Sequence, residues 1–345
     1  MDTASVIEVI IKSAILLLVM TGGFAYLTLY ERKVLARLQV RIGPNRAGPL
    51  GILQPIADAI KLIFKEELIP ASAHKFIFIL APVITVLPAL VITAVIPWGG
   101  TVNLFGRQVH LEVADINVGV LYITAVASIA VYGITLAGWS SNNKYAMLGG
   151  LRASAQMISY ELGLGLAFIS PIIIAGSMRV TDIIQAQADL GIIKWLLLQP
   201  LAPIIFLVAS IAEVNRAPFD MPEAEQELTA GYHTEYSGMK FALFFMAEYI
   251  KMIAVSAIAA TLFFGGYLGP FVDRWPGLGP VYLLIKIVIL LFWMIWIRAT
   301  IPRIRYDRLM AFGWKVLLPV GLLSVFLSAV LVLVFNVGVP FTPGG

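Results

Sequence analysis

The chain contains the uncharged run FIFILAPVITVLPALVITAVI at residues 76–96. An α-helix rises 1.5 Å per residue, so about 20 apolar residues cross the hydrocarbon core of a bilayer. Pro82 and Pro88 do not argue against such a helix, because membrane helices tolerate proline better than soluble helices do. The run therefore predicts a membrane-spanning helix.

Seven further apolar runs of about this length are found at residues 7–30, 118–139, 154–175, 195–212, 241–264, 281–296 and 316–337. The chain as a whole is 60% hydrophobic and 13% charged, whereas soluble domains have about 25% charged residues. We therefore expect an all-α polytopic membrane protein with eight transmembrane helices in one membrane domain, residues 1–345. Only Met1 to Val6 precede the first run and none is basic, which favours a retained first span over a cleaved signal peptide.

An additional, amphipathic helix is predicted from Pro55 to Glu66. Within it, one helical face carries Asp58, Lys61 and Lys65, and the opposite face carries Ile56, Ile60, Ile63 and Phe64. This pattern is typical of a helix that lies in the membrane interface rather than crossing the bilayer.

Basic residues gather on one side of the predicted topology. The loops 31–75, 140–153, 213–240 and 298–315 hold 17 lysines and arginines, whereas the opposite loops hold four, Arg107, Arg179, Lys194 and Arg274. The positive-inside rule makes the first set cytoplasmic and places both termini on the periplasmic side. The net charge of +4 thus reflects topology and contact with anionic lipid, and we expect no nucleic-acid partner. Within the second of these loops, the glycine pair at 149–150 is expected to break the chain before the next span.

Several kinds of cofactor site are not expected in this chain. It has no cysteine and three widely separated histidines, His74, His110 and His233, which argues against disulfides, zinc sites and cysteine-held iron–sulfur clusters. No glycine-rich nucleotide loop follows a strand pattern. We expect no metal and no cofactor in this chain, so any electron chemistry must come from partners.

The polar segment that follows residue 212 is unusually acidic. Six of the chain's 20 acidic residues fall within 23 positions, with Arg216 as the basic residue among them: Glu213, Asp220, Glu223, Glu225, Glu227 and Glu235. Carboxylates this close repel one another and hold protons more tightly. The segment is either a solvated acidic loop or part of a proton path.

Two more carboxylates are predicted inside the membrane. Glu161 and Glu248 each lie about 10 Å from the cytoplasmic ends of their spans, where a charge costs at least about 2.5–3.5 kcal/mol. Lys251, one turn from Glu248, is the expected partner if the pair is only structural. Otherwise these acids and Glu213 form a proton relay, a pattern that also fits an ion channel, a transporter or a pump.

An apolar ligand site is a further possibility raised by the sequence. The first span, the interfacial helix and the phenylalanines Phe241, Phe244 and Phe245 could enclose a slot that opens to lipid. Arg41, Asp58 and Arg298 would supply its polar rim at the cytoplasmic side.

Seven motifs together resemble one family closely. They are YERKVL (30–35), VRIGPN (40–45), QPIADAIK (54–61), RASAQMISYE (152–161), EVNRAPFD (213–220), FFMAEY (244–249) and PRIRYD (302–307). In these motifs the chain resembles the H subunit of bacterial NADH:quinone oxidoreductase, respiratory complex I, and its mitochondrial counterpart, NADH dehydrogenase subunit 1. The resemblance covers nearly the whole chain.

The resemblance implies an eight-span protein of the bacterial inner membrane, or of the mitochondrial inner membrane if organellar, that forms the membrane part of the quinone chamber. It implies partners among the other membrane subunits and the peripheral-arm quinone module, with FMN and iron–sulfur clusters held by partner subunits. The implied acidic path consists of Glu161, Glu213, Glu223, Glu225, Glu227, Glu235 and Glu248, and the implied chamber residues are Arg41, Asp58, Phe219 and Arg298.

Three other interpretations stay open at this point. In the first, the chain is a structural docking platform whose acids bind basic loops of peripheral subunits. In the second, it is the equivalent subunit of a related membrane-bound hydrogenase, which works without quinone. A free-standing ion transporter is disfavoured, because the sequence shows no internal repeat.

Overall fold

The computed structural model describes residues 3–104, 107–220, 231–272 and 274–335. Within them, seven helical segments are long and apolar enough to cross a membrane. They are α1 (Thr3–Leu38), α3 (Lys75–Ile92) with the 3₁₀ turn η2 (Thr93–Val95), α4 (Gly119–Ser140), α5 (Lys144–Ala175), α10 (Gly238–Phe263), α11 (Gly279–Thr300) preceded by η4 (Pro276–Leu278), and the continuous helix formed by α12 (Tyr306–Phe312), the π-turn η5 (Gly313–Leu317) and α13 (Leu318–Phe335). The prediction of a mostly helical chain with several helices able to span a membrane is confirmed.

The predicted span at 195–212 is not one continuous helix. This region forms α7 (Ile192–Leu198) and α8 (Ala202–Glu213), which meet at an angle of 81°. Pro200 and Pro203 lie at the break, and proline disfavours helical geometry in the residue before it. Accordingly, Gln199 has a non-helical φ of −139°. The chain crosses a membrane eight times only if this bent pair counts as one crossing.

The segments expected to be cytoplasmic loops are partly helical. α1 runs on to Leu38, α5 begins at Lys144 and α12 at Tyr306, so the described segments between the helices there are 39–53, 64–74, 141–143 and 301–305, with α2 between the first two. The apolar runs did not show this, because they mark what is buried in lipid, whereas a helix can continue past the membrane with polar residues. Arg37, Arg152, Arg308 and Lys315 are therefore helical.

The glycine pair at 149–150 does not break the chain as expected, because both residues lie within α5. Both glycines are buried, and a Cβ on Gly149 would lie 2.6 Å from the Cα of Gly231. A Cβ on Gly150 would lie 3.3 Å from the Cα of Gly138 on α4. These glycines let neighbouring backbones approach closely, a common use of small residues between membrane helices.

Two elements were not predicted, both near residues 100–190. A two-stranded antiparallel hairpin pairs β1 (Thr101–Leu104) with β2 (Arg107–His110). The segment 180–190, expected to be a loop, is the helix α6 (Val180–Leu190). α6 is too short to resemble a span, yet Val180, Ile183, Ile184 and Gln187 are buried, which is the spacing of one helical face.

The predicted amphipathic helix is present as α2 (Gln54–Ile63). It follows the 3₁₀ turn η1 (Pro49–Gly51). Ile56, Ile60 and Ile63 each expose half or more of their surface, as expected of a face that would lie against lipid. On its polar face, Asp58 accepts a hydrogen bond from Arg32 of α1 at 2.7 Å.

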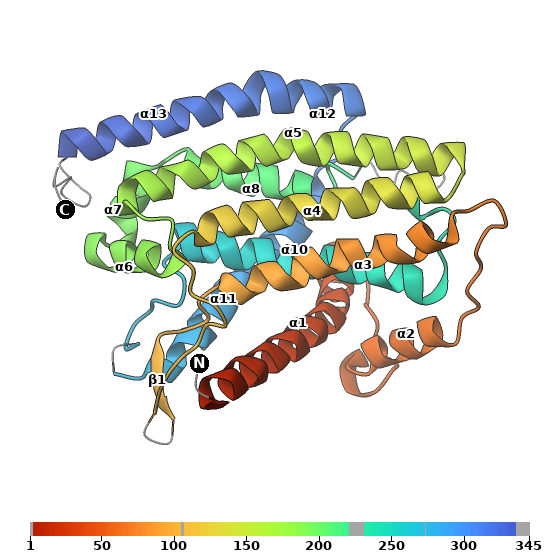
Figure 1. Cartoon of the computed structure of the whole chain (residues 1–345), viewed down its shortest axis with the longest axis horizontal. Coiled ribbons are helices and arrows are strands. Elements are labelled where there is room, and N and C mark those ends of the chain that lie inside the picture. Colours follow the sequence, from red (N-terminus) through yellow and green to blue (C-terminus); the bar gives the residue numbers. More distant parts are fainter. Residues whose placement is uncertain (1–2, 105–106, 221–230, 273, 336–345) are drawn as a thin grey trace.

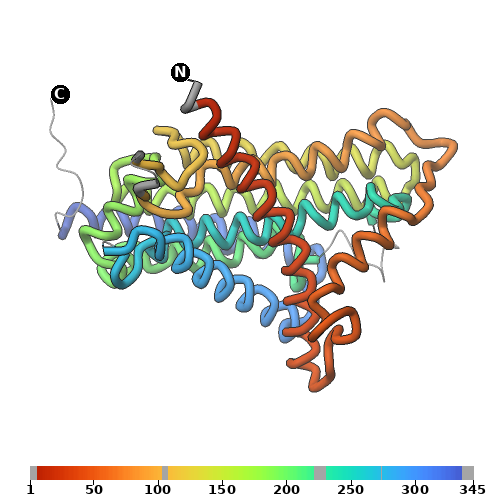
Figure 2. Tube along the Cα trace, turned by 90° about the horizontal axis from the view of Figure 1, so that it is seen from below, coloured from red at the N-terminus to blue at the C-terminus, as the bar shows by residue number. Residues whose placement is uncertain are grey.

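The long helices lie side by side and alternate in direction, while α1 crosses them obliquely (Figures 1 and 2). One end of the bundle, here called the α2 end, carries α2 and the turn between α4 and α5. The other, the hairpin end, carries the β1–β2 hairpin, α6 and α7. α10 is the most buried of the long helices. It packs against α1, α3, α8 and α11, and so places its charged residues inside the bundle.

Candidate functional site

Lys251 of α10 forms an ion pair with Glu213, the last residue of α8. Its Nζ lies 2.8 Å from Glu213 Oε1 and also donates a hydrogen bond to the backbone oxygen of Glu213 at 3.2 Å. Both residues are more than nine-tenths buried. Lys251 thus pairs with Glu213 and not, as in the purely structural alternative, with Glu248. Packing of α8 against α10 offers Lys251 a carboxylate from another helix, where it also neutralises the negative end of α8.

Glu248 faces Arg216, which lies in the turn after α8. Arg216 Nη2 is 3.6 Å from Glu248 Oε2, and Nη1 is 3.7 Å from Oε1 of Glu31 on α1. The guanidinium also lies 4.4 Å from the ring centroid of Tyr249, a favourable cation–π distance. All three charged residues are buried, so one arginine is shared between two buried carboxylates from different helices.

Glu31 extends this arrangement to α11, where Arg298 donates a hydrogen bond to Glu31 Oε1. Arg298 remains about one-third exposed, with 31% of its side chain accessible, whereas the Glu31 side chain is 3% accessible. A row of alternating charges therefore runs from the partly exposed Arg298 through Glu31 and Arg216 to Glu248. We call these four residues the charged row.

Glu31 was missed as a site residue because it was counted as the start of a polar loop. Its position in the helical pattern could have revealed it. Met20, Leu27 and Glu31 are separated by seven and four residues, which places them on one face of a helix. The first two are buried core residues, so a carboxylate at position 31 is predicted to point inward.

Glu161 lies on α5, where Ser128 of α4 donates a hydrogen bond to its carboxylate. Glu161, Glu213 and Lys251 also line one small cavity of about 30 Å³ with otherwise mostly apolar walls. That volume is enough for about one water molecule. The structure thus places Glu161 and Glu213, two of the predicted acids, at one cavity. Glu161 in addition borders a groove of about 740 Å³ between α4, α5 and α13.

The remaining predicted acids lie elsewhere. Asn143, the N-cap of α5, donates a hydrogen bond to Glu235 Oε1 at 2.7 Å. Glu223, Glu225 and Glu227 lie outside the described residues. Glu235 is therefore at the α2 end, on the same side as the charged row but in contact with a different element.

The four predicted chamber residues occupy separate contacts. Arg298 belongs to the charged row, and Asp58 joins α2 to α1 through Arg32. Phe219 is buried, with its ring 5.6 Å from the ring of Tyr160. Arg41 is exposed, donates to Gln39 at 2.8 Å and lines a cavity of about 900 Å³ at the α2 end. Among these four, Arg298 alone directly contacts an acid of the row.

An aromatic cluster covers the charged row near η3 (Gly231–His233). Tyr232 donates to Glu248 Oε1 at 3.4 Å. The ring of His233 packs against Tyr232, Phe241 and Phe244. Burial and the nearby Arg216 charge lower the pKa of His233 to about 3. His233 is thus a neutral residue of this cluster at physiological pH.

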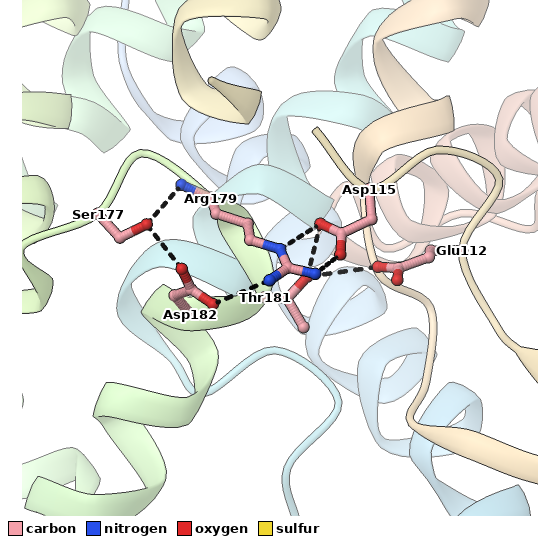
Figure 3. Close-up of polar contacts among 6 residues, drawn as sticks. All are labelled: Glu112, Asp115, Ser177, Arg179, Thr181 and Asp182. Atoms are coloured by element: carbon pink, nitrogen blue, oxygen red, sulfur yellow. Dashed lines mark hydrogen bonds and ion pairs between the residues drawn. The ribbon is translucent and has the colours of Figure 1, made fainter. Parts of the chain in front are cut away.

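A second polar cluster, which includes Glu112, Asp115, Arg179 and Asp182, lies at the hairpin end (Figure 3). Arg179 Nε donates to Asp115 Oδ1 at 2.8 Å, and Arg179 is 3.7 Å from Asp182. This bonding to Arg179 lowers the pKa of Asp115. Burial, helped by the Asp115 charge, raises the pKa of Glu112. No group of three metal-ligating side chains is found in the part of the chain that the structure describes.

The apolar helices and their paired interior charges define a multi-pass membrane protein with a polar network at one end. A family model described as NADH dehydrogenase matches residues 11–329. The chain is 50% identical over 345 residues to the H subunit of NADH-quinone oxidoreductase from Thermomicrobium roseum, covering 98% of this chain and 99% of the relative. It is 52% identical over 313 residues to that of Protochlamydia amoebophila, covering 90% and 93%. It is 50% identical over 325 residues to that of Syntrophotalea carbinolica, covering 94% and 96%. The chain therefore belongs to the H-subunit family of NADH-quinone oxidoreductases, which are multisubunit oxidoreductases.

Proposed function

We propose that this chain forms the membrane part of a quinone-binding chamber and couples quinone reduction to proton translocation. The curated relatives are named as subunits of NADH-quinone oxidoreductase, so quinone is the proposed substrate. FMN and iron–sulfur clusters would be held by partner subunits, because this chain has no cysteine. In this proposal the α2 end faces the cytoplasm and the peripheral-arm subunits, with both termini on the periplasmic side.

The sharing of Arg216 between Glu31 and Glu248 carries the proposal. Its guanidinium lies within 4 Å of both carboxylates, so it stabilises the ionised form of each. A change of charge near Arg298 and Glu31 would alter how strongly Arg216 interacts with Glu248. Proton binding at Glu248 would then respond to chemistry at the rim, which is a coupling free energy between two sites.

The second step of the proposed path leads deeper into the bundle. Lys251 is one turn from Glu248 on α10 and is held by Glu213, which shares the 30 Å³ cavity with Glu161. One water in that cavity could connect the two carboxylates, since buried waters typically make about three hydrogen bonds. Glu161 in turn borders the groove on the outer side of α5, where a neighbouring membrane subunit could receive the proton.

Arg216→Lys in the assembled enzyme tests this function. Lysine keeps the charge but lacks the planar fork that reaches two carboxylates at once. We expect quinone reduction coupled to proton uptake to fall on the order of tenfold, which corresponds to about 1.4 kcal/mol for the weakened ion pairs. The readouts are quinone-dependent NADH oxidation and proton pumping in proteoliposomes. The matched control is Arg46→Lys, at an exposed arginine in the same α2-end region.

Normal turnover and pumping in Arg216→Lys, with normal assembly, would contradict the proposed coupling role of Arg216. If the docking-platform alternative holds, native gels of the variant will show loss of peripheral subunits before any loss of specific activity. For the hydrogenase alternative, the discriminating observation is whether a flavin- and NADH-binding subunit copurifies with this chain.

A further inference from the structure

A cavity at the α2 end has an unusually basic lining. It has a volume of about 900 Å³ and lies between the last turns of α1, the segment 40–50 and α11. Three basic residues, Lys33, Arg37 and Arg41, line it, and no carboxylate is among its described lining residues. Tyr30, Val34, Leu38, Ile42 and Phe292 supply apolar walls. A cavity of this composition attracts an anionic amphiphile.

Polar and apolar parts of the lining are separated along the helix axes. Tyr30 precedes Arg37 by seven residues, so along the axis of α1 its Cα lies about 10 Å further from the C-terminal end of the helix than that of Arg37. Phe292 precedes Arg298 by six residues and lies about 9 Å deeper along α11. Lys33, Arg37 and Arg41 lie nearer the end of α1. The cations therefore form the rim and the aromatic side chains the inner part, an order that matches a lipid headgroup and its acyl chain.

The wall made by the segment 40–50 is fixed by backbone contacts. Lys33 Nζ donates to the backbone oxygen of Leu50 at 2.5 Å, and the Arg41 N–H donates to the Ala36 oxygen at 2.8 Å. Gly51 has a φ of +78°, and a Cβ there would clash with the Pro44 backbone oxygen. Only glycine fits that approach, so the sequence holds the cavity open in one conformation.

Nearby carboxylates do not neutralise the rim. Glu31 is bound by Arg216 and Arg298, and Asp58 is bound by Arg32. The Arg37 side chain is exposed, and its guanidinium makes no hydrogen bond or ion pair with any residue that the structure describes. A phosphate at the rim would therefore meet at least one cation that has no other partner among those residues, and charge-assisted contacts of this kind are strong.

We propose that this cavity binds an anionic phospholipid, with its phosphate among Lys33, Arg37 and Arg41 and one acyl chain between Tyr30 and Phe292. The site goes beyond the proposed quinone chemistry. A quinone headgroup is neutral and gives three clustered cations no counter-charge. Arg41 is also a proposed chamber residue, so the tests below leave it unchanged.

The test uses the whole assembled complex in nanodiscs that contain a photoactivatable phosphatidylglycerol. Cross-links in the wild-type protein are expected within residues 30–50 and on α11, with competition by phosphatidylglycerol and not by phosphatidylcholine. Arg37→Gln should reduce cross-linking about fivefold, and Lys33→Gln with Arg37→Gln about 25-fold, because each cation contributes about one kilocalorie per mole. Arg46→Gln is the matched control, since Arg46 is exposed in the same loop and does not line the cavity.

Three results would overturn the proposal. An equal loss in Arg46→Gln would mean general attraction to the membrane surface. A raised quinone KM in Arg37→Gln with unchanged lipid labelling would make the cavity a quinone entrance. Loss of a peripheral subunit on native gels with unchanged labelling would identify an acidic protein partner. If the double variant does not assemble, the wild-type competition between the two lipids decides the question.

Discussion

Lys251 Nζ contacts both the carboxylate and the backbone oxygen of Glu213, at 2.8 and 3.2 Å, although the two residues belong to different helices. One side chain thus neutralises a buried acid and satisfies a carbonyl at the end of α8. Helix ends leave their last carbonyls without intrahelical partners. Lys251 therefore supplies a partner for a carbonyl at the end of α8 and also a counter-charge for the Glu213 carboxylate.

Breaking this pair from one side should destabilise the bundle. Lys251→Met leaves the Glu213 carboxylate buried and unpaired, and Glu213→Gln leaves an ammonium, so each should cost about 3–5 kcal/mol. The double variant should cost less than the sum of the two. Thermal unfolding of the purified complex, arranged as a double-mutant cycle, measures the coupling. Strictly additive losses would show that the pair contributes nothing.

Gly149 provides a test of packing that does not involve charge. Gly149→Ala should cost about 1–3 kcal/mol, because its Cβ would lie 2.6 Å from Gly231 Cα and backbone must move. Gly165→Ala on the same helix is the control. No described atom lies within 4 Å of a Cβ there, so alanine should be neutral or stabilise the helix by up to about 1 kcal/mol. Thermal midpoints of the two variants give the comparison, and equal midpoints would contradict it.

The contributions of Asp115 and Glu112 to the stability of the hairpin-end cluster should change with pH in opposite directions. The folded pKa of Asp115 is lowered by Arg179, so its stabilisation is present above the unfolded pKa of about 3.9 and is lost as pH falls through the folded value. The folded pKa of Glu112 is raised by burial. Its favourable contribution is therefore full below about 4.3 and is lost as pH rises through the folded value.

Hydrogen exchange of the amides in β2 and α6 reports this cluster locally. Glu112→Gln should protect these amides more than wild type at pH 7 and equally near pH 4. Asp115→Asn should protect them less at pH 7, with the difference shrinking as the pH falls below about 3.9. A pH-independent effect of either substitution would show that its carboxyl group does not titrate against this contact.

The sequence was sufficient to predict a mostly helical chain with apolar helices long enough to span a membrane, because length and hydropathy determine which segments can enter lipid. It also drew attention to Glu161, Glu213 and Glu248, since an acid within or directly after an apolar run is conspicuous. It could not give the pairing of Lys251, because partners within one helix are visible in sequence, whereas the approach of α8 depends on packing and on the break at Pro200.

Other misses have a similar cause. Glu31 was assigned to a loop because the charges at positions 31–33 resemble a helix end, although α1 continues to Leu38. α6 was missed because a short helix beside the membrane has no long apolar run. Gly149 was interpreted as a helix breaker because its use, contact with Gly231 from 82 residues away, exists only in three dimensions.

The cavity shared by Glu161, Glu213 and Lys251 has a consequence for the membrane potential. Moving one charge across the bilayer involves about 2.3 kcal/mol per 100 mV, in proportion to the fraction of the membrane crossed. Groups that line one 30 Å³ space and sit on neighbouring helices differ little in depth, so a proton passed between them travels mainly parallel to the membrane plane. In the proposed path such a transfer would do almost no electrical work, and the voltage-dependent steps would fall to neighbouring subunits.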